Sequence, residues 1–250
     1  MQLPAAFLDR PIAHRALHNT QRGRPENSIE AISAAIQAGY GIEIDLQLSS
    51  DGEAMVFHDY DLSRLTTQTG AVRDRSAAQL ATIQLRHGQE RIPTLAQVLK
   101  LVAGKTALLI EVKDQDGAMG PDVGALEAAA VRALDGYIGP VALMSFNPHS
   151  VAALARMAPG LPRGLTTCAW DADDSPLVPA ATRASLREIP DYDRVGACFI
   201  SHDRRDLARP RVAELQRDGA AVLCWTVRSP EQEAEARKVA QNITFEGYEA

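Results

Sequence analysis

The sequence predicts a TIM (β/α)8 barrel, in which eight parallel β-strands form a closed ring and helices cover its outside. Three observations lead to this α/β fold class. The chain has 250 residues, which is about the size of one such barrel. Short apolar runs, typical of buried strands, alternate with segments of 3.6-residue periodicity. Eight such alternations favour a closed barrel over an open sheet, and we expect a single domain over residues 1–250.

The first helix should follow the first strand after a short polar loop. We predict Asn27 as its N-cap and Gly39 as its end. The runs assigned to strands are Pro11–Ala16, Gly41–Leu48, Thr106–Val112, Val141–Phe146, Arg163–Thr167, Ala197–Ser201, Ala221–Val227 and Asn242–Glu246. The other predicted helices are Leu95–Ala103, Asp122–Tyr137, Pro148–Ala158, Pro176–Glu188, Pro210–Asp218 and Ser229–Ala240.

One connection breaks the alternation of strands and helices. Only five residues separate Leu46–Leu48 from the next apolar run, Ala54–His58. Parallel strands need a crossover of about a dozen residues or more, so these two arms must form a hairpin. The hairpin should return His58 to the neighbourhood of Glu43 and Asp45.

Two further features make the predicted barrel imperfect. Too few residues follow the eighth strand to form a final helix. Residues 60–93 form a long polar excursion with one short helical candidate, Ser76–Ile83. Loops of this length in compact domains are often functional. We therefore expect this excursion to be an insertion over the barrel mouth.

The bulk properties limit the partners of the chain. The formal net charge is −6 without a basic block, which argues against nucleic acid as a partner. No stretch approaches the ~18 consecutive apolar residues of a transmembrane segment, and Met1–Arg10 lacks the pattern of a signal peptide. The thiols of Cys168, Cys198 and Cys224 form no CxxC motif, and we expect them to be buried and free in a reducing cytoplasm. The sequence leaves open whether the chain forms a homo-oligomer.

Acidic side chains stand near the ends of two predicted strands. Glu43 and Asp45 are two positions apart and therefore point to the same face of their strand. Glu111 ends another apolar run. Such carboxylates could be solvated on an exposed face, but both faces of a barrel strand are covered. Burying them together is costly without a cation, so we predict that all three bind a hard divalent metal, Ca²⁺ or Mg²⁺.

Two histidines each follow an apolar run: His14 after the first and His58 after the hairpin arm. A histidine in this position is often only a packed core residue. Two of them beside carboxylates favour a catalytic pair, because a near-neutral pKa lets one accept a proton while the other donates one.

Cationic groups lie next to these residues. Arg15 can hold phosphate oxygens through two parallel hydrogen bonds, and Lys113 can neutralise them as a point charge. Glu26 and Asn27 either take part in the site, or Glu26 is only an acid favoured by a helix N-terminus and Asn27 only a cap. Trp225 is either core or a pocket wall. Histidines, oxygen ligands and cations together predict metal-assisted chemistry on a phosphate ester.

The order of these motifs resembles that of the glycerophosphodiester phosphodiesterase family. The motifs are His14-Arg15, Pro25-Glu26-Asn27, Glu43-x-Asp45, Asp51-Gly52 and His58-Asp59. Later landmarks of the resemblance are Ile92-Pro93-Thr94-Leu95, Glu111-x-Lys113, Ser145-Phe146 and Trp225-Thr226. The resemblance spans roughly residues 12–227, and it is specific because many spaced motifs occur in the right order.

The resemblance implies a TIM barrel, a divalent cation and hydrolysis of small-molecule glycerophosphodiesters to glycerol 3-phosphate and an alcohol. It implies that His14 and His58 are the acid/base pair and that Arg15 and Lys113 contact phosphate. The metal ligands would be Glu43, Asp45 and Glu111, and the pocket walls would be Phe146 and Trp225.

The chain departs from the family pattern at three places. Ala16 replaces the usual glycine after His-Arg, Leu17–Arg24 is polar and basic, and Ile243–Gly247 lacks the usual aspartate-containing ending. These departures bear on substrate preference, and the head-group alcohol stays open. Two alternative functions are also open. One is a related barrel phospholipase or lyase that stops at a cyclic phosphate, and the other is a catalytically silent module that binds phosphate esters.

Overall fold

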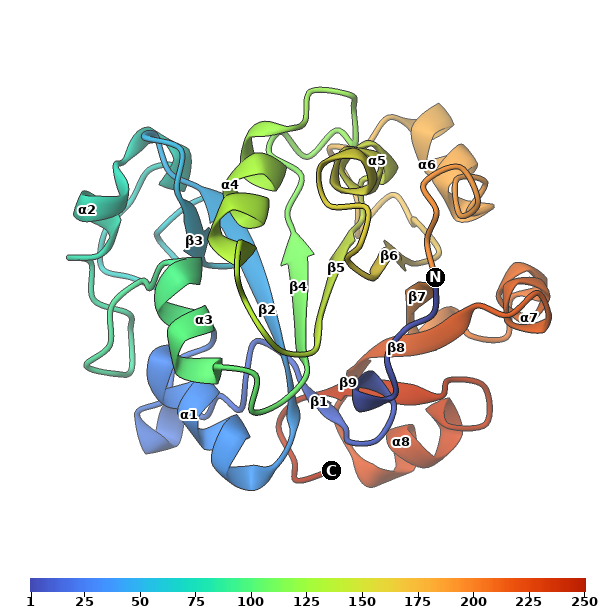
Figure 1. The fold of residues 1–250 in the computed structure, drawn as a ribbon, viewed down its shortest axis with the longest axis horizontal. Helices are drawn as coiled ribbons and strands as arrows, with labels where there is room; N and C mark the ends of the chain where they lie inside the picture. Colours follow the sequence, from blue (N-terminus) through green and yellow to red (C-terminus); the bar gives the residue numbers. More distant parts are fainter.

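The computed structural model describes residues 1–250 and contains a closed barrel of eight parallel strands (Figure 1). Pairing of β1 with both β2 and β9 closes the ring. The predicted TIM barrel is therefore confirmed. The barrel strands are β1 (Ile12–Ala13), β2 (Gly41–Leu48), β4 (Leu108–Val112), β5 (Val141–Ser145), β6 (Arg163–Thr167), β7 (Phe199–Asp203), β8 (Ala221–Val227) and β9 (Asn242–Phe245).

The predicted hairpin is also confirmed. β3 (Ala54–Val56) pairs antiparallel with the end of β2, with Leu46 opposite Val56 and Leu48 opposite Ala54. The amide nitrogen of Phe57 donates to the carbonyl of Asp45, which continues this pairing up to His58. The turn therefore brings His58 back to the acidic end of β2.

Helices cover the outside of the barrel, and a large apolar core fills the space between them and the strands (Figure 1). No helix follows β9, and none combines the length and apolarity needed to cross a bilayer. The helices are α1 (Ile29–Ala38), α2 (Ala77–Leu80), α3 (Leu95–Val102), α4 (Ala125–Leu134), α5 (Pro148–Met157), α6 (Ala180–Arg187), α7 (Pro210–Arg217) and α8 (Pro230–Ala236).

The start of α1 differs from the prediction. Ser28 is the N-cap, and its hydroxyl accepts a hydrogen bond from the amide of Ala31 at 3.1 Å. The prediction of Asn27 was wrong because Asn27 adopts a positive φ of 59° and turns its side chain towards β2. Gly39 ends the helix as predicted, with a φ of 77° that glycine adopts without steric cost.

The first strand is shorter than predicted, and this shapes the site. β1 ends at Ala13, because Arg15 and Ala16 have φ values of 53° and 64° and turn the backbone away from the strand. Glycine adopts this conformation without strain, whereas alanine pays for it. Ala16 therefore holds a turn conformation that glycine would adopt more easily.

The bottom of the barrel is closed by apolar side chains. Leu109, Phe199 and Leu223 point inward and pack against Leu3 and Phe7 of the N-terminal segment. Polar side chains at the carboxyl ends of the strands therefore face the open mouth, where the sites of this fold lie.

The excursion of residues 60–93 packs on its own apolar cluster beside β3, where α2 lies in Figure 1. Its helix is shorter than predicted, with Ser76 as the N-cap of the four-residue α2. The beginning of the excursion reaches the barrel mouth, where Tyr60 lines a cavity and Arg64 binds Glu26 and Asp59.

Candidate active site

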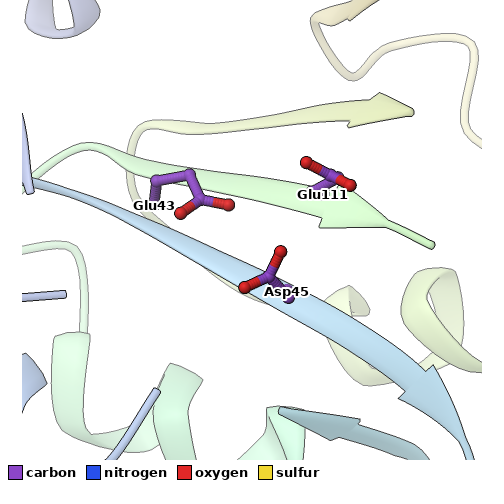
Figure 2. Close-up of side chains that lie close together, drawn as sticks. All are labelled: Glu43, Asp45 and Glu111. Atoms are coloured by element: carbon purple, nitrogen blue, oxygen red, sulfur yellow. The ribbon is translucent and has the colours of Figure 1, made fainter. Parts of the chain in front are cut away.

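Three carboxylates converge at the mouth of the barrel. Glu43 and Asp45 project from β2, and Glu111 projects from the neighbouring β4, where it lies in register with Asp45 (Figure 2). One oxygen from each side chain lies within 4.8 Å of the others, and all three residues are buried. The structure therefore brings together the carboxylates that the sequence singled out.

Two carboxylates of this acidic cluster have pKa values shifted in opposite directions. Burial, together with the charges of Asp45 and Glu111, raises the pKa of Glu43 well above its usual value. Burial also opposes ionisation of Asp45, but Lys113, His58 and Arg15 outweigh it and lower the pKa of that carboxyl. Hard oxygen donors at such spacing fit a divalent cation, whose charge would relieve the repulsion.

Lys113 lies directly against the acidic cluster. Its Nζ is 2.8 Å from Oδ1 of Asp45 and 2.5 Å from Oε1 of Glu111. Burial alone would favour the neutral amine, but Asp45 and Glu111 prevail and raise the pKa of Lys113. The side chain is therefore a buried cation at the mouth.

Asn27 takes part in the site by orienting Asp45, a contact that the sequence did not reveal. Its Nδ2 donates to Oδ2 of Asp45 at 2.8 Å, and its Oδ1 accepts from the amide of Asp45 at 3.2 Å. This double contact joins residues 18 positions apart. It fixes the carboxylate and accounts for the unusual backbone of Asn27.

Arg15 contacts both the acidic cluster and the excursion. Its amide donates to Oε2 of Glu43 at 2.8 Å, and its guanidinium donates to Oε1 of Glu26 at 2.8 Å. Arg64 binds the same carboxylate. Burial opposes ionisation of Glu26, but Arg64 and Arg15 outweigh it and lower its pKa. Glu26 thus stands between two arginines, where it positions Arg15.

Each predicted catalytic histidine is held by a carboxylate that an arginine holds in turn. Nδ1 of His14 lies 2.5 Å from Oε2 of Glu246, and Arg228 donates to Glu246 at 2.8 Å. On the other side of the mouth, Nδ1 of His58 lies 2.6 Å from Oδ1 of Asp59.

Arg64 in turn holds Asp59, because its guanidinium donates to that carboxylate at 2.6 and 2.7 Å. Both contacts engage Nδ1 and leave Nε2 of each ring free for chemistry. Sequence reasoning missed the supporting groups Asp59, Arg64, Arg228 and Glu246. The His58-Asp59 pair was a visible signal, whereas nothing in the sequence tied Glu246 to His14.

The pKa shifts of His14 and Glu246 indicate which member of this pair carries a charge. Burial lowers the pKa of His14 although Glu246 acts in the opposite direction. Burial also opposes ionisation of Glu246, but the neighbouring His14, His18 and Arg228 outweigh it and lower the pKa of that carboxyl. His14 is therefore a neutral imidazole beside a carboxylate near neutral pH, and it can accept a proton.

Two cavities meet at these residues. The inner cavity, of about 150 Å³, lies inside the barrel and is lined by His14, Arg15 and Glu43 among others. The outer cavity, of about 630 Å³, opens above it between the excursion, the segments after β4–β7 and Trp225 of β8. The two cavities share five lining residues, which are His58, Glu111, Lys113, Phe146 and Trp225.

Aromatic rings form one wall of the passage between the cavities. Phe146 packs edge to face against Trp225, with ring centroids 5.5 Å apart. Trp170, which the sequence did not suggest, packs against the ring of Phe146, with ring centroids 5.6 Å apart. Trp225 is fixed further because its Nε1 donates to the carbonyl of Ser201 at 3.0 Å. The aromatic rings therefore form one apolar wall of the outer cavity, whose lining also includes charged side chains such as Asp59, Asp171 and Asp174.

The late start of α6 adds to that wall. The predicted helix began at Pro176, but α6 begins at Ala180, and residues 176–178 line the outer cavity instead. Cys198 and Cys224 are buried free thiols as predicted. Cys168 is free but only half-buried, because it lies in the wall of the outer cavity.

Comparison with known proteins gives consistent results. Residues 14–242 match the glycerophosphoryl diester phosphodiesterase family. A glycerophosphodiester phosphodiesterase of Caldanaerobacter subterraneus is 34% identical over 164 residues, which cover 62% of this chain and 65% of that protein. A glycerophosphodiester phosphodiesterase of Bacillus subtilis is 26% identical over 82% of this chain and 73% of that protein.

A solved structure shows the same fold. It is an Oleispira antarctica phosphodiesterase in complex with its product, sn-glycerol-3-phosphate. The two chains superpose with a TM-score of 0.77 at 23% identity, over 96% of this chain and 94% of that one.

Proposed function

Because the chain belongs to the glycerophosphoryl diester phosphodiesterase family, we propose that it hydrolyses glycerophosphodiesters to glycerol 3-phosphate and an alcohol. The observation that carries this proposal is the pair of supported histidines beside the acidic cluster. His14 and His58 both line the inner cavity, each with Nδ1 held by a carboxylate. Two ready proton-transfer groups are what cleavage of a phosphodiester by acid/base catalysis requires.

The acidic cluster is proposed to hold a divalent cation, either Ca²⁺ or Mg²⁺. The ligands would be Glu43, Asp45 and Glu111, whose buried oxygens suit a hard cation. When bound, the cation would supply positive charge that stabilises a phosphate oxygen in the transition state. Asn27 keeps Asp45 in place for this role.

We propose different tasks for the two histidines, on the basis of the cavities that they line. His14 lines only the inner cavity and is neutral, so we assign it the role of base. Its Nε2 takes the proton of the nucleophile, either water or the glycerol 2-hydroxyl in a cyclising first step. His58 lines both cavities and is more exposed, at 29% of its side chain against 13% for His14. It donates a proton to the alcohol oxygen as the phosphorus–oxygen bond breaks and the alcohol leaves outward.

Positive charge for the phosphate comes from Arg15 and Lys113, which both line the inner cavity. Burial opposes the charge of Arg15, but Asp45 and Glu26 outweigh it and raise its pKa, so the guanidinium stays charged. Charged donors fixed in a buried site stabilise developing negative charge without reorganisation. Phe146 and Trp225 wall the path of the substrate.

A panel of glycerophosphodiesters with different alcohols tests the proposal. We expect release of glycerol 3-phosphate, and its loss when a chelator removes divalent cations. Phosphorus NMR of the same reactions separates the alternatives. A cyclic phosphate that accumulates as the end product would indicate the lyase-type reaction, and no turnover of any diester would indicate a silent binding module.

We also propose a cellular compartment for the enzyme. The buried, unpaired thiols of Cys198 and Cys224 support a reducing compartment such as the cytoplasm. Light scattering on the purified protein would show whether the chain forms a homo-oligomer.

A further inference from the structure

A third cavity, of about 450 Å³, lies beside the barrel, and we call it the side cavity. It shares no lining residue with the inner or the outer cavity. Its walls are the basic segment Leu17–Arg24, the last turns of α1, and residues 245–249. It therefore lies on the side of the barrel where no helix follows β9 and where the C-terminus lies near α1 (Figure 1).

The basic segment holds two arginines, Arg22 and Arg24, on a fixed backbone. Asn19 and Arg24 pair across a tight turn, with backbone N–H···O distances of 2.8 and 3.0 Å. The side chain of Asn19 also accepts from the amide of Arg22 at 3.1 Å. Gly23 completes the turn with a φ of 68°, which glycine adopts without strain. Both arginines line the side cavity from this turn.

Arg24 is a partly buried cation without a partner. Its Nε is enclosed without an acceptor, whereas its two terminal nitrogens stay accessible and are also unpaired. Every other partly buried arginine of the chain donates to an acceptor, and these are Arg15, Arg75, Arg163, Arg183, Arg187, Arg204, Arg209 and Arg211. A charged group that loses hydration without gaining an acceptor costs free energy. The position of Arg24 therefore indicates an acceptor from outside the chain.

The charges of the lining favour an anion. Arg22 is exposed and, like Arg24, forms no ion pair. Glu246 is already paired with Arg228 at 2.7 Å, and Glu249 is exposed, so that solvent screens its charge. The two arginines therefore leave the side cavity with a net positive charge, in a chain whose formal net charge is −6.

We propose that the side cavity is a second oxyanion site, in which Arg22 and Arg24 bind a phosphate group. A guanidinium donates two parallel hydrogen bonds to a phosphate, and the several oxygens of a phosphate can accept from both arginines at once. A cavity of about 450 Å³ is larger than a phosphate ion, so the group is either free phosphate or part of a small phosphomonoester. The site is independent of the proposed hydrolysis, because it shares no lining residue with the reaction centre.

Titration calorimetry with inorganic phosphate tests the site. Lys113→Met weakens phosphate binding at the reaction centre, so the side cavity is the binding event that survives in this variant. Adding Arg24→Gln should weaken the surviving event by about 10-fold to 100-fold, because a charged donor is lost. Adding Arg22→Gln instead should weaken it by about 3-fold to 10-fold, since Arg22 is more exposed. Glycerol 3-phosphate in the Lys113→Met protein identifies the ligand: tighter binding than inorganic phosphate indicates a phosphomonoester, and equal or weaker binding indicates free phosphate.

Melting temperatures separate binding from a structural role of Arg24. Its side chain makes no hydrogen bond, so Arg24→Gln should not lower Tm in phosphate-free buffer. Phosphate should raise the Tm of Lys113→Met, and this increase should disappear when Arg24→Gln is added. Arg217→Gln is a matched control, because Arg217 is an exposed arginine without an ion pair at the end of α7. This variant should bind phosphate as the wild type does.

Three results would overturn the site. In the first, no binding event survives in Lys113→Met, or the surviving event is unchanged by both Arg22→Gln and Arg24→Gln. In the second, Arg24→Gln melts far lower without phosphate, which would make Arg24 a structural cation. In the third, Arg217→Gln loses as much affinity as Arg24→Gln, which would show that phosphate only follows the net charge of the protein.

Discussion

Replacing Glu246 with glutamine should slow catalysis although this residue does not contact the substrate. Glu246 does not line the inner cavity and acts on it through Nδ1 of His14, at 2.5 Å, and through Arg228, which lines the cavity. Glutamine keeps the size of the side chain and removes its charge. Glu246→Gln therefore withdraws the carboxylate that fixes the ring and stabilises the imidazolium formed when His14 accepts a proton.

The size of the effect follows from the geometry. Two unit charges about 4 Å apart interact by about 4 kcal/mol at the effective dielectric constant of a partly buried site. Glu246 shares its charge with Arg228, at 2.7 Å, and its side chain is partly exposed, so roughly half of this energy is retained. A loss of about 2 kcal/mol in the transition state corresponds to a decrease of about 30-fold in kcat.

Steady-state kinetics over a range of pH is the assay. We expect kcat to fall, KM to stay within about 2-fold, and the acid limb of the kcat profile to move to lower pH. The limb moves because Glu246 raises the pKa of His14, so its removal leaves burial and Arg15 to lower that pKa further. A base with a lower pKa is neutral, and therefore active, at lower pH.

Glu249→Gln provides the control. Glu249 is a nearby exposed acid that forms no ion pair. Its replacement should leave kcat and the pH profile as in the wild type. The reasoning would be refuted if Glu246→Gln kept the wild-type kcat and acid limb, or if both variants lost activity equally.

Three further predictions concern other residues. His58→Ala should lower kcat by about 10² to 10⁴ if His58 protonates the leaving alcohol, and wild-type turnover would exclude that role. Lys113→Met removes the ammonium but keeps much of the apolar stem, so kcat/KM should fall sharply while Tm with Mg²⁺ or Ca²⁺ present stays near that of the wild type. A variant that melts far lower yet retains turnover per folded molecule would instead show that Lys113 is structural. His202→Asn tests how stability depends on pH. Burial lowers the pKa of His202 although Asp206 and Asp203 act in the opposite direction. Nδ1 of its ring also lies 2.8 Å from the hydroxyl of Thr167. The folded state therefore resists protonation, so wild-type stability is intact at neutral pH and falls as the pH drops below the ordinary histidine pKa of ~6.5. The variant should show a shallower fall in Tm between pH 7 and pH 5, and an unchanged slope would contradict this account.

The sequence by itself determined the barrel and the core of the site. Alternating apolar runs and helical periods carry the fold, because a parallel strand must be followed by a crossover. Five residues after Leu48 are too few for a crossover, so the hairpin was predictable. Glu43 and Asp45 share a face because side chains alternate along any strand, whatever the rest of the fold does. These features depend on local geometry, which neighbouring residues specify.

The tertiary structure decided the features that depend on distant partners. Asn27 resembles a helix cap in sequence, but its hydrogen bonds to Asp45 outweigh the local preference, and Ser28 caps α1 instead. Glu246 meets His14 across 232 positions only because β9 pairs with β1 and closes the ring.

Thr166, Ser201 and Thr244 likewise look like ordinary strand residues in the sequence, and only closure of the barrel brings them together. The pairing of the strands then places all three against one cavity. No local pattern marks such a group, because its position is set by closure and strand register rather than by the residues beside it in the chain.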